Sequence, residues 1–240
     1  MEQHSPRLGA VMSSVRGVVF DKDGTLADLD ARWVPFFRRA IDDLASACDD
    51  PALVTALRLE LGVEDTFLVP DGPSAVETPT RIIERIVAAV VARGHDPRRV
   101  DAFVAEAAAG HTLGPLCPIG DIVGALRMLR ERGMLLGVAT SDDRGNTMTE
   151  LAALGVTELL PTVRCGDDDT VKPDPAVLLG IVDEWGLGAD ELLFVGDSQA
   201  DLETARGAGS PFVARCDPDR TPAWAGKADA IVANIAMMVV

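Results

Sequence analysis

Positive charge is scarce in this chain of 240 residues, which carries 22 Lys and Arg against 38 Asp and Glu and has a formal net charge of −16. A surface with this excess of negative charge repels phosphate backbones and anionic lipid head groups. We therefore expect neither a nucleic acid nor a membrane surface as a partner. Lysine is rarer still, since the chain has only Lys22, Lys172 and Lys227.

Cysteine is also sparse, and the spacing of Cys48, Cys117, Cys165 and Cys216 includes no C-x-x-C pair. This spacing argues against a zinc knuckle and a thioredoxin-like site, and it favours reduced thiols in a cytoplasmic protein. The N-terminus has no apolar block of signal-peptide length, and no uncharged run reaches about 18 residues. We expect neither export nor a membrane anchor, and either a monomer or a homodimer. The glycine-rich motifs of nucleotide-binding loops and the serine elbow of hydrolases are absent as well.

The composition, 48% hydrophobic and 25% charged, is that of a folded globular protein. Short apolar, β-branched runs alternate with segments of helical periodicity. This alternation predicts the α/β class, with a mostly parallel sheet covered by helices on both faces. The predicted strands are 15–20, 134–139, 159–163, 192–195, 212–214 and 230–232.

A long stretch between the first two predicted strands shows helical periodicity alone. It runs from about residue 28 to about residue 113, with apolar side chains such as Trp33, Phe37 and Ile41 on one stripe. We therefore predict a core domain formed by residues 1–27 and 114–240 and an inserted all-helical domain formed by residues 28–113.

Polar residues follow the predicted strands at the edge where parallel sheets bind ligands. Asp21 and Asp23 follow the first strand, Thr140 and Ser141 the second, and Asp197 the strand 192–195. Carboxylates that converge in this way require a cation, and an all-oxygen site suits Mg²⁺. With Lys172 and Thr140 to hold anionic oxygens, the pattern is typical of a phosphoryl-transfer site.

Each of these segments taken alone has an ordinary structural explanation. The sequence 21–25, Asp-Lys-Asp-Gly-Thr, could be a solvated turn, although Leu26 and Arg32 stand where a calcium-binding EF-hand loop requires Gly and Glu. The occurrence of all the segments in a fixed order at one sheet edge favours the functional interpretation. In an extended segment Asp21 and Asp23 share a side, and we expect Lys22 to point away from them and to have no catalytic consequence.

Four segments together resemble the motifs of the haloacid dehalogenase superfamily: 21–25, Thr140, Lys172-Pro173-x-Pro175 and Gly196-Asp197-Ser198-x-x-Asp201. With the helical insert after the first motif, the chain looks like the phosphoglycolate-phosphatase-like branch, which has a helical cap. The resemblance implies a Rossmann-like three-layer core and a Mg²⁺-dependent, two-step hydrolysis through an aspartyl-phosphate. It also implies a small phosphorylated metabolite, phosphoglycolate-like or a sugar phosphate, as substrate.

The same resemblance implies roles for the catalytic residues. Asp21 would attack phosphorus, and Asp23 would protonate the leaving alcohol and later activate water. Thr140 would bind a phosphoryl oxygen. Lys172 would balance the charge of Asp21 and the phosphoryl group.

The metal would be held by Asp21, Asp197 and the backbone carbonyl of Asp23. Thr25, Ser198 and Asp201 would support these groups from outside the coordination sphere, with Thr25 orienting Asp23. Ser141 stands where many relatives carry Asn, so we place it among the substrate contacts. Arg32 and Arg81, both in the insert, are hypothesised to bind an anionic group of the substrate.

Two other functions remain open. A phosphosugar mutase of the β-phosphoglucomutase type shares the nucleophile, the acid/base and the metal, although Gly196 stands where such mutases tend to carry Glu. A non-catalytic phospho-switch module would need neither Asp23 nor a cap. A phosphonoacetaldehyde-type hydrolase is disfavoured because the insert contains no lysine that could form a Schiff base.

Overall fold

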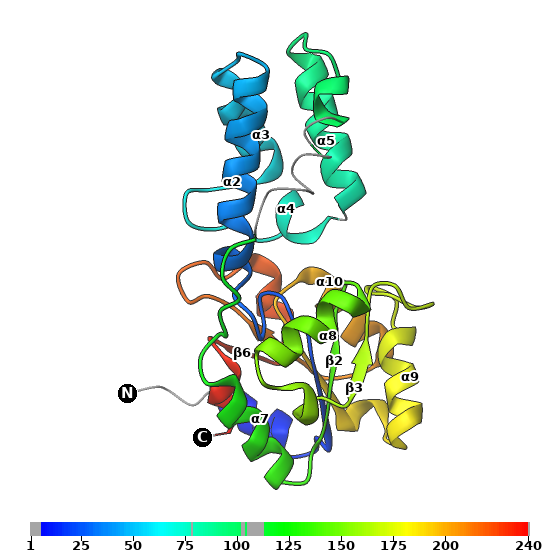
Figure 1. The fold of residues 1–240 in the computed structure, drawn as a ribbon. Coiled ribbons are helices and arrows are strands. Elements are labelled where there is room, and N and C mark those ends of the chain that lie inside the picture. Colours follow the sequence, from blue (N-terminus) through cyan, green and yellow to red (C-terminus); the bar gives the residue numbers. More distant parts are fainter. Residues whose placement is uncertain (1–5, 78, 102–103, 105–112, 240) are drawn as a thin grey trace. The chain divides into compact units, whose positions relative to one another are not determined.

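The computed structural model describes residues 6–77, 79–101, 104 and 113–239. The chain divides into two compact units. The first, formed by Met1–Asp28 and Pro118–Val240, is called the sheet unit here, and the second, Leu29–Cys117, is called the helical unit. Each unit is coloured by its place in the sequence in Figure 1.

The sheet unit contains one six-stranded sheet in the order β3-β2-β1-β4-β5-β6. Every neighbouring pair is parallel, which confirms the predicted α/β class. In the central strand, Phe20 is level with Val138 of β2 and Val195 of β4, so the residues that follow these three strands meet at one edge. The strands are β1 (Gly17–Phe20), β2 (Leu135–Ala139), β3 (Thr162–Arg164), β4 (Leu192–Gly196), β5 (Phe212–Arg215) and β6 (Ala230–Val232).

Helices cover both faces of this sheet. Alternate residues of β4 show how the two layers form: Leu193 and Val195 join one hydrophobic cluster, and Leu192 and Phe194 join the other. Burial on both faces explains why the strands are continuous apolar runs in the sequence. The first cluster is completed by α1 (Pro6–Met12), α7 (Ile122–Glu131) and α8 (Arg144–Ala153), and the second by α9 (Ala176–Trp185) and α10 (Gln199–Ala208). Short 3₁₀ turns span Thr157–Leu159, Ala189–Glu191, Ala223–Lys227 and Ile235–Met238.

The third strand lies later in the chain than predicted. Leu159 ends a 3₁₀ turn, and β3 begins at Thr162. Pro161 separates the two, and proline has no N–H to donate to a sheet ladder. The apolar run 159–163 therefore contains both a turn and a strand.

The helical unit includes α2 (Leu29–Ala47), α3 (Ala52–Leu61), α4 (Pro73–Val76) and α5 (Pro79–Ala92). Their apolar stripes form a separate core that includes Phe37, Ile41, Leu44 and Leu57. The sequence after Pro97 is rich in alanine, and part of this segment lies outside the described residues. No helix within the described ranges is long and apolar enough to cross a membrane.

The packing of α7 against the sheet gives a test of the core. Leu126 is fully buried, so Leu126→Ala should lower the free energy of unfolding by about 2–5 kcal/mol in urea titrations. Leu179→Ala on α9 is the matched control, because Leu179 is 41% exposed and should cost about 0.5 kcal/mol or less. Equal losses in the two variants would contradict this account of the core.

Candidate active site

The loop after β1 brings Asp21 to the edge of the sheet. The backbone N–H of Asp21 donates to the carbonyl of Val195 at 2.8 Å, which fixes the start of the loop beside the end of β4. Gly24 follows with a positive φ of 84°, and its N–H donates to the carbonyl of Ala27 at 2.8 Å. A Cβ at Gly24 would lie 1.9 Å from Oδ2 of Asp197. Only glycine lets the loop approach that carboxylate so closely.

Three carboxylates gather at this edge. One oxygen from each of Asp21, Asp197 and Asp201 lies within 4.8 Å of the others. The ammonium group of Lys172 donates to Oδ1 of Asp21 at 2.5 Å and to Oδ1 of Asp201 at 2.7 Å. The structure therefore brings together residues from three of the four predicted motifs.

Asp201 is held by the N-terminus of its own helix. Its Oδ2 accepts hydrogen bonds from the backbone N–H of Ser198 at 3.1 Å and from the Ser198 hydroxyl at 2.7 Å. A Cβ at Gly196 would lie 2.5 Å from this same oxygen, so the glycine leaves room for the helix to begin here. Both oxygens of Asp201 are thus engaged, whereas Asp197 accepts only a 3.5 Å contact from Thr25 within the described part of the chain.

The burial of so many carboxylates changes their acidity. Burial raises the pKa of Asp21 to about 7, with Lys172 opposing the rise and Asp201 adding to it. Burial also raises the pKa of Asp197 well above its ordinary value, helped by Asp21 and Asp201. Burial alone would lower the pKa of Lys172, but Asp201 and Asp21 outweigh it and raise that pKa. The site holds more negative charge than Lys172 balances.

This donor set fits a hard divalent cation. Its side-chain groups are carboxylates, which Mg²⁺ and Ca²⁺ prefer, and the raised pKa values show that positive charge would stabilise the ionised forms. Asp21 and Asp197 have oxygens that can turn to such an ion. Asp201 is committed to Lys172 and Ser198.

Thr140 and Ser141 lie at the end of β2, beside β1. Thr140 is buried, and its N–H donates to the carbonyl of Arg164 at 2.9 Å. Its hydroxyl accepts a hydrogen bond from the N–H of Asp142 at 3.2 Å, which folds the loop back on itself. The side chain of Ser141 is exposed.

The side chain of Lys22 does not point away from the acidic residues as we expected. It is fully buried, and its ammonium group lies 2.7 Å from Oδ2 of Asp23. The alternation rule fails here because β1 ends at Phe20 and the chain turns at once. Burial raises the pKa of Asp23, and Lys22 opposes that rise.

Two contacts could not be seen in the sequence. Arg215, the last residue of β5, donates from Nη1 to the carbonyl of Gly24 at 3.1 Å, and its charge opposes the raised pKa of Asp197. The Thr25 hydroxyl contacts Asp197 at 3.5 Å, although we expected it to orient Asp23. The position of Arg215 at a strand end is a signal, but it becomes useful only once β5 is known to lie beside β4.

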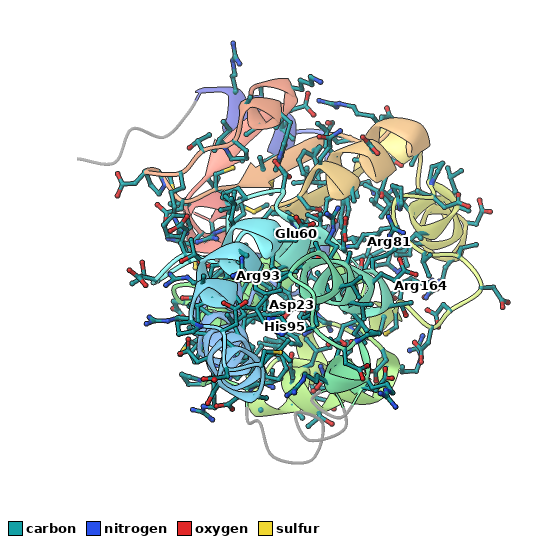
Figure 2. The ribbon with its side chains drawn as sticks, turned by 90° about the horizontal axis from the view of Figure 1, so that it is seen from above. Asp23, Glu60, Arg81, Arg93, His95 and Arg164 are labelled. Carbon is teal, nitrogen blue, oxygen red and sulfur yellow. The ribbon has the colours of Figure 1, made fainter. Side chains whose placement is uncertain are left out.

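The two arginines hypothesised to bind substrate lie in the helical unit. Arg32 donates from Nη1 to the carbonyl of Gly114 at 2.9 Å. Arg81, labelled in Figure 2, is an exposed residue of α5 that pairs with Glu84 at 2.8 Å.

The raised carboxyl pKa values predict how stability depends on pH. An unfolded aspartate titrates near pH 3.9, so between about pH 4 and pH 7 the folded protein binds more protons at Asp21 and Asp197 than the unfolded chain does. In a chelator, the Tm should therefore fall as the pH rises from about 5 to about 7.5. Asp21→Asn should flatten this fall, and added Mg²⁺ should raise the Tm of the wild type most at the higher pH.

Calorimetry or dye-based melting across this range makes the measurement. Arg39→Gln, at an exposed position in the helical unit, is the control and should keep the wild-type slope. A Tm that rises with pH through the window in the presence of chelator would contradict the charge balance described above.

Comparison with known proteins agrees with the family resemblance of the sequence motifs. The family model for haloacid dehalogenase-like hydrolases matches residues 15–209. A phosphoglycolate phosphatase of Rhodospirillum rubrum is 32% identical over 213 residues, which cover 82% of this chain and 78% of that protein. The phosphoglycolate phosphatase of Pectobacterium atrosepticum is 32% identical over 203 residues, covering 83% and 80% of the two chains.

Solved structures share the fold. A Haemophilus somnus protein described as a predicted phosphoglycolate phosphatase has a TM-score of 0.65 at 21% identity, covering 94% of this chain and 96% of that one. A Thermotoga maritima protein described as a candidate β-phosphoglucomutase has a TM-score of 0.64 at 17% identity, covering 94% and 97%. These likenesses confirm the predicted architecture of a Rossmann-like core with an inserted cap. Because the family model covers residues 15–209, the chain belongs to the haloacid dehalogenase-like hydrolases.

Proposed function

We propose that the protein is a Mg²⁺-dependent phosphatase that hydrolyses a small phosphomonoester through an aspartyl-phosphate on Asp21. The observation that carries this proposal is the contact of one buried lysine with Asp21 and Asp201, in a carboxylate cluster that also contains Asp197. Such a site suits a nucleophilic carboxylate whose charge must be controlled while it approaches an anionic phosphoryl group.

The first half-reaction forms a bond between a carboxylate oxygen of Asp21 and phosphorus. The bond from phosphorus to the ester oxygen breaks, and Asp23 gives its proton to that oxygen as the alcohol leaves. In the second half-reaction Asp23 takes a proton from water, and the water oxygen bonds to phosphorus. The bond between phosphorus and Asp21 breaks, so phosphate leaves and the Asp21 carboxylate is restored. Thr140 contributes a hydroxyl at the phosphoryl oxygens, with Ser141 beside it, and Lys172 balances the charge.

Asp21, Asp197 and the backbone carbonyl of Asp23 would hold the metal ion. When bound, Mg²⁺ supplies positive charge that draws the phosphoryl group toward Asp21 and stabilises the charge that develops in the transition state. Asp201 and Ser198 support the arrangement by holding Lys172 in place.

The substrate that we propose is phosphoglycolate or a sugar phosphate of similar size. The curated relatives at 32% identity are phosphoglycolate phosphatases, which favours this class. A mutase of the β-phosphoglucomutase type and a phospho-switch remain the alternatives. Gly196 favours hydrolysis over the mutase, and Asp23, which would serve as an acid for a leaving alcohol, weighs against a switch. The four cysteines form no disulfide within the described residues, which supports a cytoplasmic location.

Phosphate release from a panel of phosphomonoesters tests the function. The wild type should turn over in Mg²⁺ and stop in EDTA, and Asp21→Asn should lower kcat by at least about 10³-fold because it removes the nucleophile. The ranking of kcat/KM across the panel assigns the leaving group. A folded protein that converts one sugar phosphate to its isomer without releasing phosphate would instead be a mutase. A protein that takes up one phosphoryl group and then releases no phosphate would be a switch.

We also propose that the helical unit is the cap that selects the substrate, with Arg32 or Arg81 binding an anionic group. A charged hydrogen bond contributes about 1.5–3 kcal/mol, so Arg32→Gln or Arg81→Gln should lower kcat/KM for the preferred substrate by about 10- to 100-fold. Arg39→Gln, on an exposed position of α2, is the matched control. Unchanged kcat/KM for every accepted substrate in both variants would refute this assignment.

A further inference from the structure

Lys22 is a buried cation that the proposed mechanism does not use. It stands between the two aspartates of the first motif, and its side chain is only 1% exposed. Its ammonium group donates to Asp23 at 2.9 Å, lies 3.1 Å from Oδ2 of Asp142, and also donates to Glu150 of α8. A buried lysine needs such partners, because an unpaired ammonium group away from water is strongly destabilising.

The partners of Lys22 differ in how much they depend on it. Glu150 is nearly as buried as the lysine, with 4% of its side chain exposed, so this pair can serve packing between α8 and the sheet. Asp23 and Asp142 keep 25% and 22% of their side chains exposed. These two carboxylates are therefore more accessible to water than Glu150, and they depend less on Lys22 for their burial than Glu150 does.

The contact with Asp23 restricts where its carboxylate can lie. Both oxygens of Asp23 lie within 2.9 Å of the Lys22 ammonium group. This ammonium group is itself held in place by Glu150 of α8. The backbone carbonyl of Lys22 also accepts from Leu26 and Ala27 at 2.9 Å each, so the loop that carries Asp23 is closed by the same residue.

The same cluster reaches the loop after β2. Asp142 accepts a hydrogen bond from the Asn146 side chain at 2.5 Å, and its N–H donates to the hydroxyl of Thr140 at 3.2 Å. Lys22 thus connects the loop of Asp23 with the loop of Thr140. These are the two segments that the proposed mechanism places around the leaving oxygen and the phosphoryl group.

We propose that Lys22 is a positioning residue that fixes the carboxylate of Asp23 for proton transfer to the leaving oxygen. The inference rests on the proposed function. A general acid must lie within hydrogen-bond reach of the oxygen that it protonates, and small displacements of such a group slow the reaction greatly. The ion pair limits the rotamers of Asp23 before the substrate arrives.

The dependence on the leaving group separates this role from a structural one. An alkoxide leaves poorly unless it is protonated, whereas a nitrophenolate leaves without help. The value of kcat/KM reports the steps up to formation of the aspartyl-phosphate, in which Asp23 acts as the acid. A misplaced Asp23 therefore slows the cleavage of alkyl phosphates much more than that of p-nitrophenyl phosphate.

The experiment compares Lys22→Met with the wild type on two esters: p-nitrophenyl phosphate and the alkyl phosphate with the highest kcat/KM in the panel. We expect the loss of kcat/KM on the alkyl ester to exceed the loss on the aryl ester by at least about tenfold, since general acid catalysis contributes about 10²–10⁴-fold. Lys227→Met applies the same substitution to an exposed lysine and should match the wild type on both esters.

Removal of Lys22 alone leaves the buried carboxylate of Glu150 without this cation, so Lys22→Met could fail to fold. The double variant Lys22→Met with Glu150→Met replaces both members of the buried pair with apolar groups of similar length, which buried pairs often tolerate. Circular dichroism and melting check both proteins, and the double variant should show the same dependence on the leaving group.

Equal losses on the two esters in a folded variant would overturn the positioning role. So would a failure of both variants to fold, which would assign Lys22 to stability alone. If the wild type and Lys227→Met hydrolyse neither ester, the proposed function itself fails, and the role of Lys22 fails with it. The wild-type arm thus distinguishes the two failures.

Discussion

The ammonium group of Lys172 donates to Asp21 and Asp201 at once, and this double contact ties the loop after β1 to the first turn of α10. Three carboxylates lie within a few ångströms of each other around it. Without a cation among them, their mutual repulsion and the loss of hydration would oppose folding at this edge of the sheet. Lys172 does not balance all of this negative charge. The Ser198 hydroxyl stabilises Asp201 by a hydrogen bond, and the charge of Arg215 stabilises the ionised form of Asp197.

The topology of the sheet determines where the acidic residues come together. Because all pairings are parallel and β1 is central, the loops after β1, β2 and β4 emerge side by side. The loops after β1 and β4 contribute the clustered carboxylates, and the loop after β2 contributes the hydroxyl of Thr140. The two buried lysines divide the acidic groups between them. Lys172 holds Asp21 and Asp201, and Lys22 holds Asp23, Asp142 and Glu150.

The sequence predicts the α/β class because buried parallel strands are apolar runs, and it locates much of the site because polar residues follow those runs directly. It misplaces β3, where Pro161 splits one apolar run into a turn and a strand. The direction of Lys22 could not be predicted, because side-chain alternation applies within a strand and β1 ends two residues earlier. The contact of Arg215 with Gly24 and that of Thr25 with Asp197 depend on which strands are neighbours in the sheet. The order of the strands cannot be read from a single sequence.

The close approach of Gly24 to Asp197 has a consequence for how this enzyme can change over time. Replacing a glycine with alanine stabilises a protein by about 0.4–1 kcal/mol where the native backbone conformation suits alanine, because the unfolded chain loses freedom. That route is closed here, since a methyl group at Gly24 would occupy the space of a carboxylate oxygen and the positive φ disfavours any side chain. The conformational freedom that Gly24 gives the unfolded chain therefore cannot be removed by alanine at this position without displacing the carboxylate of Asp197.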